Sequence, residues 1–240
     1  MLYKTNGIVL KTVKYSESSV IVKIYTRRFG LRSYLIRGTA GKKARIKKGS
    51  LQPLNILQLV VYNKEKDQLQ NLKEIEAIIP FHHIPFDIRK STVLMFLNEV
   101  LYKSIREEEC NEALYDFLEK ALLDFDRQET GSENFHLWFC AGLTRFLGFV
   151  PRNNYSANND CFDLQEGMFF HGPPLHANHI DSGSSRIISQ LLSSSSPAEV
   201  PLKNASDRNR MLEILISYYK LHLPNFKEVK SHQVLKQILN

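Results

Sequence analysis

The chain has 240 residues, of which 43% are hydrophobic and 24% are charged, and this composition excludes a disordered or collagen-like chain. The longest apolar run, residues 55–62, is much shorter than the roughly 20 residues of a membrane-spanning helix, so we expect no membrane span. The first residues include Lys4 and Lys11 and no continuous apolar segment, so we expect no signal peptide. Three cysteines are too few for a disulfide framework, which favours a reducing compartment and a cytoplasmic protein.

Positive charge is concentrated in the first third of the sequence. The formal net charge is +7, but residues 1–80 hold 16 basic and 5 acidic side chains, whereas residues 81–150 hold 7 and 12. In the first 50 residues, 13 basic side chains accompany a single acidic one, Glu17. A field of one sign indicates a polyanionic partner, either a nucleic acid or an anionic surface, and a solvated basic face without a partner is the alternative.

The same third of the chain has the period-two pattern of β-strands. Alternation is clearest in residues 18–25, where Val20, Val22 and Ile24 share one face. Polar or glycine-containing turns follow at residues 27–30 and 63–67, and a long loop, residues 38–49, joins the third strand to the fourth. This order predicts a five-stranded OB-fold barrel over residues 1–79, with an SH3-like barrel as the alternative. The expected strands are residues 7–13, 18–25, 31–37, 55–62 and 69–75.

This first domain combines cationic side chains with aromatic ones, which is how OB-folds bind single strands. The loop 38–49 has three glycines and five basic residues, so its backbone is able to follow a phosphate chain while the charges are neutralised. Most aromatic residues are expected in the core, and one or two are expected to stack on bases. Because no recognition helix is evident, the predicted binding is independent of sequence. The predicted DNA-binding residues are Arg27, Arg28, Arg32, Arg37, Lys42, Lys43, Arg45, Lys47, Lys48, Tyr15 and Tyr34.

Residues 80–240 are predicted to form a helical domain, which makes the expected fold class α+β. The segment Pro80–Pro85 interrupts the strand pattern, and helical periodicity follows it. Asp87 is a candidate N-cap of the first helix. Cys110 and Cys140 lie in helical runs and are interpreted as core residues. The expected helices are residues 87–106, 110–125, 132–148, 184–192, 206–221 and 231–239, which together predict a bundle.

No motif in the sequence indicates catalysis. The acidic residues Glu107–Glu109, Glu112, Asp116 and Glu119 are interpreted as the solvated face of the second helix. Neither a phosphate-binding loop of the Walker type nor a GxSxG or GxGxxG motif is present, so we expect no ATP hydrolysis and no enzyme.

A polar, irregular insert occupies residues 151–183. It includes Cys161, His171, His176 and His179, and the spacing of His176 and His179 is one of the close pairs that zinc sites use. Cys161 has no second cysteine three residues on, since Leu164 stands there. A zinc site with Asp163 or His171 as the fourth ligand is one interpretation, and a loop or small hairpin packed without metal is the preferred one.

Short motifs follow one another along the chain in a characteristic order. They are Gly7-Ile8-Val9-Leu10, Tyr15-Ser16-Glu17-Ser18, Tyr25-Thr26, Gly30, Arg37-Gly38, Leu51-Gln52-Pro53-Leu54, Phe96-Leu97-Asn98-Glu99-Val100-Leu101, Leu147-Gly148-Phe149 and Val229-Lys230-Ser231-His232. Their order and spacing resemble the RecO family of bacterial recombination mediator proteins over essentially the whole chain. Two departures stand out: that family's C-x-x-C pairs correspond here to Cys161/Leu164 and His176/His179, and its Arg-Phe-Glu triplet corresponds to Trp138-Phe139-Cys140.

The resemblance implies a non-enzymatic function in DNA repair and recombination. It implies binding of single- and double-stranded DNA by the OB domain, strand annealing, and contact of the helical domain with the tail of single-stranded-DNA-binding protein (SSB). It also implies pairing with RecR and loading of RecA onto SSB-coated strands in a cytoplasmic, nucleoid-associated protein. Two alternatives fit the residues: an RNA-binding OB protein of ribosome or tRNA metabolism, and a metal-dependent nuclease that uses the insert.

Overall fold

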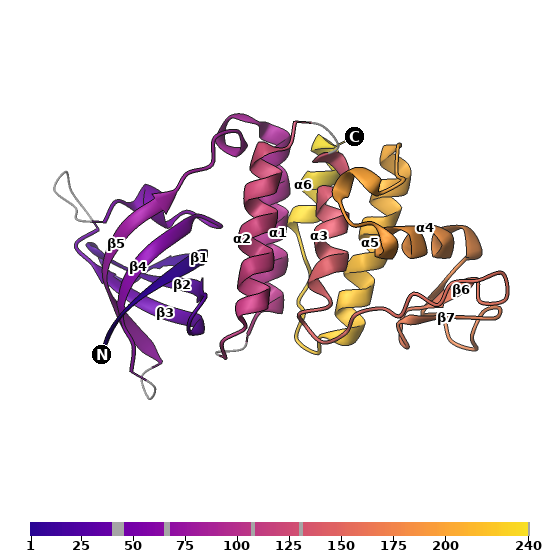
Figure 1. Ribbon diagram of the computed structural model, residues 1–240, viewed down its shortest axis with the longest axis horizontal. Coiled ribbons are helices and arrows are strands. Elements are labelled where there is room, and N and C mark those ends of the chain that lie inside the picture. The colour runs from indigo at the N-terminus through magenta and orange to yellow at the C-terminus, as the bar shows by residue number, and fades with distance from the viewer. Residues whose placement is uncertain (40–45, 65–67, 107–108, 130–131, 240) are drawn as a thin grey trace. The chain divides into compact units, whose positions relative to one another are not determined.

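A computed structural model describes residues 1–39, 46–64, 68–106, 109–129 and 132–239. The chain forms two compact units (Figure 1): a barrel unit, residues 1–85 and 105–126, and a helical unit, residues 86–104 and 127–240. The predicted division of the chain into two independent domains, residues 1–79 and 80–240, stays a prediction. The compact units differ from it in two respects, because residues 80–85 and residues 105–126, which include most of helix α2 (Glu112–Arg127), belong with the barrel.

The barrel unit has the predicted OB architecture. Its strands form a closed barrel in the order β1-β2-β3-β5-β4, in which β3 and β5 pair in parallel and every other pair is antiparallel. Each of the five predicted strands is present, although β1 and β5 are longer than expected. The strands are β1 (Leu2–Lys14), β2 (Ser19–Thr26), β3 (Gly30–Arg37), β4 (Ile56–Tyr62) and β5 (Leu69–Ile79).

Alternating side chains fill the barrel, as the period-two pattern predicts. A tight approach occurs at Gly7, where a Cβ atom would lie 2.6 Å from Ile24 and 2.9 Å from Leu59. A 3₁₀ helix (Lys48–Leu51) adds Leu51 to the same core, which also includes Ile46. The buried core consists of Val9, Val20, Val22, Ile24, Tyr34, Ile36, Ile46, Leu51, Leu57, Leu59, Val61 and Leu72.

Helix α2 (Glu112–Arg127) packs on the barrel strands. The rings of Tyr25 and Tyr115 are stacked with centroids 6.5 Å apart, and the Tyr25 hydroxyl donates a hydrogen bond to the backbone oxygen of Asn111. Cys110 is exposed and precedes the helix, so its predicted core role is wrong; its thiol lies 3.1 Å from the backbone oxygen of Arg27. Cys140, by contrast, is buried as predicted.

A buried carboxylate fixes the end of the barrel unit. Asp126 accepts hydrogen bonds from the backbone N–H groups of His82, His83 and Ile84 at 2.7–2.9 Å. Burial by itself raises the pKa of Asp126, but these donors outweigh burial and hold the pKa below its usual value. Asp126 therefore joins the turn after β5 to the end of α2.

The helical unit contains the other predicted helices. α1 packs on α6 and α3, and α3 packs on α4 and α5. Side-chain caps explain three of the starts: Asp87 accepts the N–H groups of Arg89 and Lys90, Asp181 that of Ser184, and Asn204 that of Asp207. The helices are α1 (Ile88–Ser104), α3 (Phe135–Leu143), α4 (Ser182–Ser193), α5 (Ala205–His222) and α6 (Ser231–Ile238). In the described part of the chain, none of the helices is long and apolar enough to cross a membrane.

The third predicted helix is shorter than expected at both ends. A 3₁₀ helix (Ser132–Asn134) precedes α3, and α3 ends at Leu143 rather than near residue 148. The Thr144 hydroxyl donates to the backbone oxygen of Ala141 at 2.6 Å, and the next N–H groups bond three residues back, which tightens the turn. Gly148 then adopts a φ of +83° and turns the chain toward the insert.

The insert is more regular than predicted. It contains a three-stranded sheet in the order β7-β6-β8, from β6 (Cys161–Asp163), β7 (Met168–Phe170) and β8 (His179–Ile180). Aromatic side chains form its core: the rings of Phe162 and Phe169 have centroids 4.8 Å apart, and Phe162 also contacts Tyr218 of α5. The preferred interpretation, a small packed hairpin, is therefore close to the structure, with one additional strand.

Candidate nucleic-acid interface

One end of the barrel gathers three segments that are far apart in sequence. The Tyr15 N–H donates to the Ser19 oxygen and the Thr39 N–H to the Ser18 oxygen, at 3.0 and 2.9 Å, so the β1–β2 turn adjoins the end of β3. The Thr12 hydroxyl donates to the backbone oxygen of Leu51 at 2.7 Å and attaches the 3₁₀ helix to β1. We call this surface the loop end; its described residues are 14–18, 37–39 and 47–50.

Four of the predicted DNA-binding residues are exposed at the loop end. Arg37 ends β3, and its guanidinium donates to the Asn71 side-chain oxygen at 3.3 Å. Lys47 and Lys48 are exposed at the start of the 3₁₀ helix, and the Tyr15 ring is 64% exposed. Lys42, Lys43 and Arg45 lie outside the described residues. The loop end thus has cations and one aromatic ring, the two components that contact single strands.

At the other end of β3, two of the predicted DNA-binding residues, Arg27 and Arg28, make contacts within the protein. The Arg27 guanidinium donates to both carboxylate oxygens of Asp116, at 3.0 and 3.3 Å, and forms an ion pair with Glu112. The hydrogen bond to Asp116, together with these carboxylate charges, raises the pKa of Arg27. Arg28 lies over the Tyr3 ring at 4.6 Å and near the Phe29 ring at 5.6 Å. This surface, residues 27–29, is called the hairpin end.

Two further predicted DNA-binding residues are less exposed to solvent than contact with DNA requires. Tyr34 is fully buried in the barrel core, so its prediction as a base-stacking residue is wrong: its position on β3 alternates inward with Ile36. Burial also raises the pKa of its phenol. Arg32 lies opposite Ile24 in the β2–β3 register, is half-buried, and donates to the backbone oxygen of Leu31.

The sequence-based list omits basic residues of the barrel wall. Lys11 and Lys23 are directly opposite each other in the β1–β2 register, and Lys14 ends β1 within the loop end. The alternation of β2 gives a signal for Lys23, because a lysine between inward-facing Val22 and Ile24 points outward. The signal for Lys11 is hidden by an irregularity in the register between Val9 and Lys11.

The candidate zinc ligands of the insert are occupied by separate hydrogen bonds. The Cys161 thiol donates to the Ile180 oxygen at 3.3 Å, and His176 Nε2 lies 3.0 Å from an Asp163 carboxylate oxygen. His179 and His171 pair through Nδ1 with the backbone oxygens of His176 and Asn158. Within the described ranges, no three His, Cys, Asp or Glu side chains are close enough to share a metal ion. These residues therefore do not fit a zinc site, and the nuclease alternative has no metal cluster here to support it.

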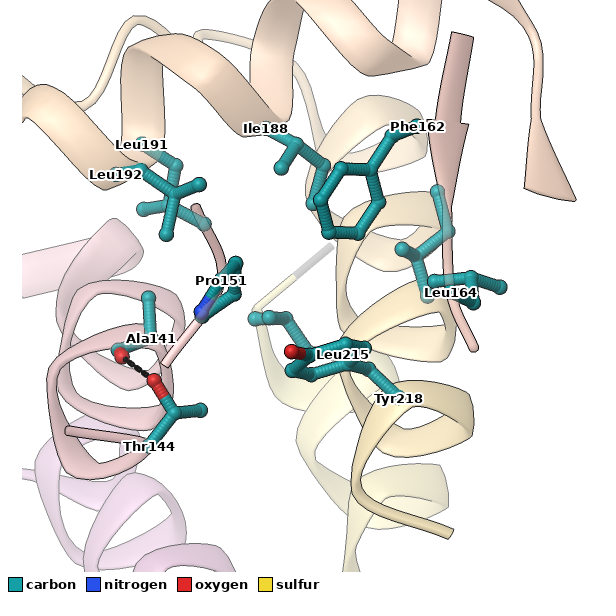
Figure 2. A pocket seen from close by; sticks show the side chains of 11 residues that line it. Ala141, Thr144, Pro151, Phe162, Leu164, Ile188, Leu191, Leu192, Leu215 and Tyr218 are labelled. Atoms are coloured by element: carbon teal, nitrogen blue, oxygen red, sulfur yellow. Dashed lines mark hydrogen bonds between the residues drawn. The ribbon is translucent and has the colours of Figure 1, made fainter. Parts of the chain in front are cut away.

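An enclosed cavity of the helical unit is too small for a substrate. It has a volume of about 10 Å³ and lies between α3, α4, α5 and β6. Figure 2 shows side chains that line it, among them the apolar Pro151, Phe162 and Leu215. The polar groups in view are already used, since the Thr144 hydroxyl bonds the Ala141 oxygen. A site of this size and polarity does not hold a small-molecule ligand.

Comparison with known proteins gives a consistent result over the whole chain. The family described as Recombination protein O N terminal matches residues 1–81, and the family described as Recombination protein O C terminal matches residues 85–232. The protein named DNA repair protein RecO from Flavobacterium psychrophilum is 37% identical over 243 residues, and that from Flavobacterium johnsoniae is 38% identical, each covering 100% of both chains. A protein of the same name from Bacteroides fragilis is 36% identical over 242 residues, again covering 100% of both chains. None of these names states a catalytic activity.

Proposed function

The chain belongs to the RecO family of DNA repair proteins, and from this premise we propose that it is a non-enzymatic recombination mediator that binds DNA at the loop end of its barrel. The observation that carries the proposal is the difference between the two ends of β3. Arg37, Lys47 and Lys48 are exposed at the loop end, whereas Arg27 at the hairpin end is neutralised by Asp116 and Glu112.

The chemistry of the loop end suits phosphate-led binding. Lysine and arginine side chains that contact phosphates release condensed counterions, which gives affinity without sequence preference and a strong dependence on salt. Because that contribution does not require bases, it applies to single- and double-stranded DNA alike. Strand annealing then requires only that two strands be neutralised and held with their bases accessible, and no nucleotide hydrolysis is involved.

We further propose that a cavity of the helical unit binds the tail of SSB, which the family resemblance implies as a partner together with RecR and, indirectly, RecA. A surface cavity of about 460 Å³ is lined by Arg89, Lys203 and Arg208 together with Glu133 and two leucines. Arg208 is held in place, since it donates to the backbone oxygens of Lys203 and Leu239 at 3.2 and 3.1 Å. Three cations beside apolar side chains suit a peptide with acidic residues and an apolar C-terminal residue.

Binding of that tail is tested with a fluorescent acidic peptide that ends in an apolar residue. Arg208→Ala is expected to weaken binding about tenfold, the loss typical of one charge-assisted hydrogen bond. Arg210→Ala is the matched control, because Arg210 is two residues further on and forms its ion pair with Asp181 instead. Equal affinities of the two variants would show that the SSB tail does not bind in this cavity.

From the proposed DNA binding we also expect a cytoplasmic, nucleoid-associated location.

DNA binding is tested by fluorescence anisotropy of a labelled single-stranded oligonucleotide over a salt series. In the variant with Lys42, Lys43, Arg45, Lys47 and Lys48 replaced by Ala, we expect weaker binding and a salt slope reduced by up to about 3.5, since each lost contact removes about 0.7. The control removes five exposed cations of the helical unit: Arg145, Arg152, Arg186, Lys220 and Lys227. The proposal is contradicted if the parent protein does not bind at low salt, or if both variants lose affinity equally. In a direct competition between DNA and RNA, preference for RNA would favour an RNA-binding function.

A further inference from the structure

The end of helix α6 forms part of the cavity to which we assign the tail of SSB. Leu239, the residue that follows α6, lines this cavity together with Leu202, and its side chain is half-buried. Its backbone oxygen accepts a hydrogen bond from the Arg208 guanidinium at 3.1 Å. That oxygen lies at the C-terminal end of α6, where the macrodipole of a helix is negative. A single residue of the chain therefore brings an apolar side chain and a partly negative oxygen to the cavity.

Leu239 has the two features by which a peptide would be held in the same place. A peptide that ends in an apolar residue offers an apolar side chain next to a carboxylate, and guanidinium groups bind carboxylates through two parallel N–H groups. Both terminal nitrogens of Arg208 already donate to backbone oxygens, one to that of Leu239 and the other to that of Lys203 at 3.2 Å. A carboxylate that Arg208 binds with both terminal nitrogens therefore replaces these backbone oxygens.

The two ends of α6 are held with different strength. At the first turn, Glu99 accepts the Ser231 N–H at 2.8 Å, and Leu235 is only 1% exposed. At the last turn, Lys236 forms an ion pair with Glu213 of α5, and both side chains are partly exposed. Exposed ion pairs contribute little to stability, and the ends of helices open locally at low cost. The last turn is therefore able to open while the first turn stays docked on α1.

We propose that the end of α6 is an autoinhibitory contact: Leu239 occupies the place of the apolar last residue of an acidic peptide, which binds when the last turn of α6 opens. The inference rests on the proposed binding of the SSB tail and adds its regulation. The apparent affinity of the parent protein is then lower than that of the open cavity, in proportion to the fraction of open molecules. An acidic peptide without an apolar last residue lacks the side chain that replaces Leu239 and binds more weakly.

The decisive variant is Leu239→Ala, because the two roles of Leu239 predict opposite results. If Leu239 competes with the peptide, its truncation frees space in the cavity. Affinity for the fluorescent acidic peptide is then expected to rise about fivefold, the effect of one half-buried leucine. If Leu239 is instead a wall of the site, affinity falls. Val234→Ala is the matched control, because Val234 is also on α6, is 43% exposed and is not among the described residues that line the cavity. Its affinity should be that of the parent.

A second variant separates the opening of α6 from a change of charge. Lys236→Ala removes the ion pair with Glu213, so the last turn opens more readily, and we expect peptide affinity to rise about two- to threefold although a cation is lost. Lys227→Ala, the control, removes an exposed cation that precedes α6 and should not raise affinity.

Hydrogen exchange of the parent protein gives a direct readout of the opening. The Leu239 N–H bonds to the Leu235 oxygen at 3.0 Å, and it should exchange faster when the acidic peptide is bound.

The results separate this inference from the function on which it rests. If Leu239→Ala binds the peptide no more tightly than the parent protein, or if the Leu239 N–H does not exchange faster with peptide bound, the end of α6 does not compete and the inference is wrong, although the cavity still binds the tail. Binding that is detected only in Leu239→Ala supports complete inhibition in the parent. If neither protein binds the peptide, the proposed site itself fails.

Discussion

The two ends of β3 have the same kinds of side chain but different surroundings. At the hairpin end, Arg27 is bound by carboxylates of α2 and Arg28 lies on the Tyr3 ring. At the loop end, Arg37 is bound by a neutral amide, and Lys47 and Lys48 are exposed. The difference teaches that a cluster of positive charge in a sequence is not one binding surface, because the fold uses some cations for its own stability.

The first prediction tests how strongly α2 is held to the barrel. Asp126→Ala removes the acceptor of three buried N–H groups, and we expect it to lower the free energy of unfolding by about 3–4 kcal/mol, the cost of unsatisfied buried donors. Urea denaturation of the full chain measures the change. Asp124→Ala is the control, since Asp124 is exposed and pairs with Lys120 along the helix, and it should cost less than about 0.5 kcal/mol. Similar losses in the two variants would show that Asp126 does not join the elements.

Two glycines of the insert show the same contrast between a position that is packed against other residues and a position with open space around it. Gly167 and Gly172 both have a positive φ, +66° and +71°, but a Cβ at Gly167 would lie 2.5 Å from the Tyr218 hydroxyl, whereas none of the described atoms lies within 4 Å of one at Gly172. We expect Gly167→Ala to cost about 2–3 kcal/mol and Gly172→Ala about 1 kcal/mol, the backbone cost alone. Thermal unfolding of both variants provides the comparison, and a Gly172 variant as unstable as the Gly167 variant would refute the packing argument.

A hydrogen-bonded carboxylate in the helical unit predicts that the stability of the fold decreases in acid. Glu99 accepts the backbone N–H groups of Lys230 and Ser231 and pairs with Lys103. Burial alone raises the pKa of Glu99, but these donors outweigh burial and lower it from 4.5 to about 2. Because the folded-state pKa is the lower one, the stabilisation is present above about pH 4.5 and is lost as the pH falls toward 2.

This linkage is measured by urea denaturation at pH 7 and pH 3 for the parent protein and Glu99→Gln. The parent is expected to lose about 2 kcal/mol more than the variant over this interval, since the variant has no charge to titrate there. A parallel loss in the two proteins would exclude Glu99 as a source of the acid sensitivity.

The smallest effect is expected from metal removal. Cys161, His176 and His179 make separate hydrogen bonds and the insert has an aromatic core, so a chelator should shift the melting temperature by less than about 1 °C. A large shift, accompanied by zinc in the purified protein, would show that these side chains rearrange around a metal.

The sequence predicts the strands and helices well because their signals are local. Alternation in residues 18–25 and the caps at Asp87 depend only on neighbouring residues, and both predictions are confirmed. The apolar pattern of the sequence predicts that α3 ends near residue 148, because the pattern continues past Thr144. The helix ends at Leu143, since the Thr144 hydroxyl competes for the helix backbone there. The strands of the insert are too short for alternation to be detected.

The candidate site was less predictable because it depends on pairing between distant segments. Arg27 meets Asp116 across 89 residues, and no local pattern indicates that α2 neutralises the β2–β3 turn. Tyr34 could be assigned to the core only by fixing which face of β3 points inward, which the hydrophobic pattern of a half-buried strand leaves open. Composition assigns the positive charge to the barrel unit, and the register decides which of its cations are exposed.

The most direct test of the central claim compares three cations of the loop end with three cations that already have contacts elsewhere in the barrel unit, namely Lys4 with Glu76, Arg27 with Asp116 and Arg28 with the Tyr3 ring. Single-stranded DNA binding is measured over a salt series for Arg37→Ala/Lys47→Ala/Lys48→Ala and for Lys4→Ala/Arg27→Ala/Arg28→Ala, with folding verified by circular dichroism. The loop-end variant is expected to lose about 2 from the salt slope, about 0.7 for each of three lost phosphate contacts, while the other variant keeps the parent slope. Equal slopes in the two variants, or a larger loss in the Lys4/Arg27/Arg28 variant, would contradict the account.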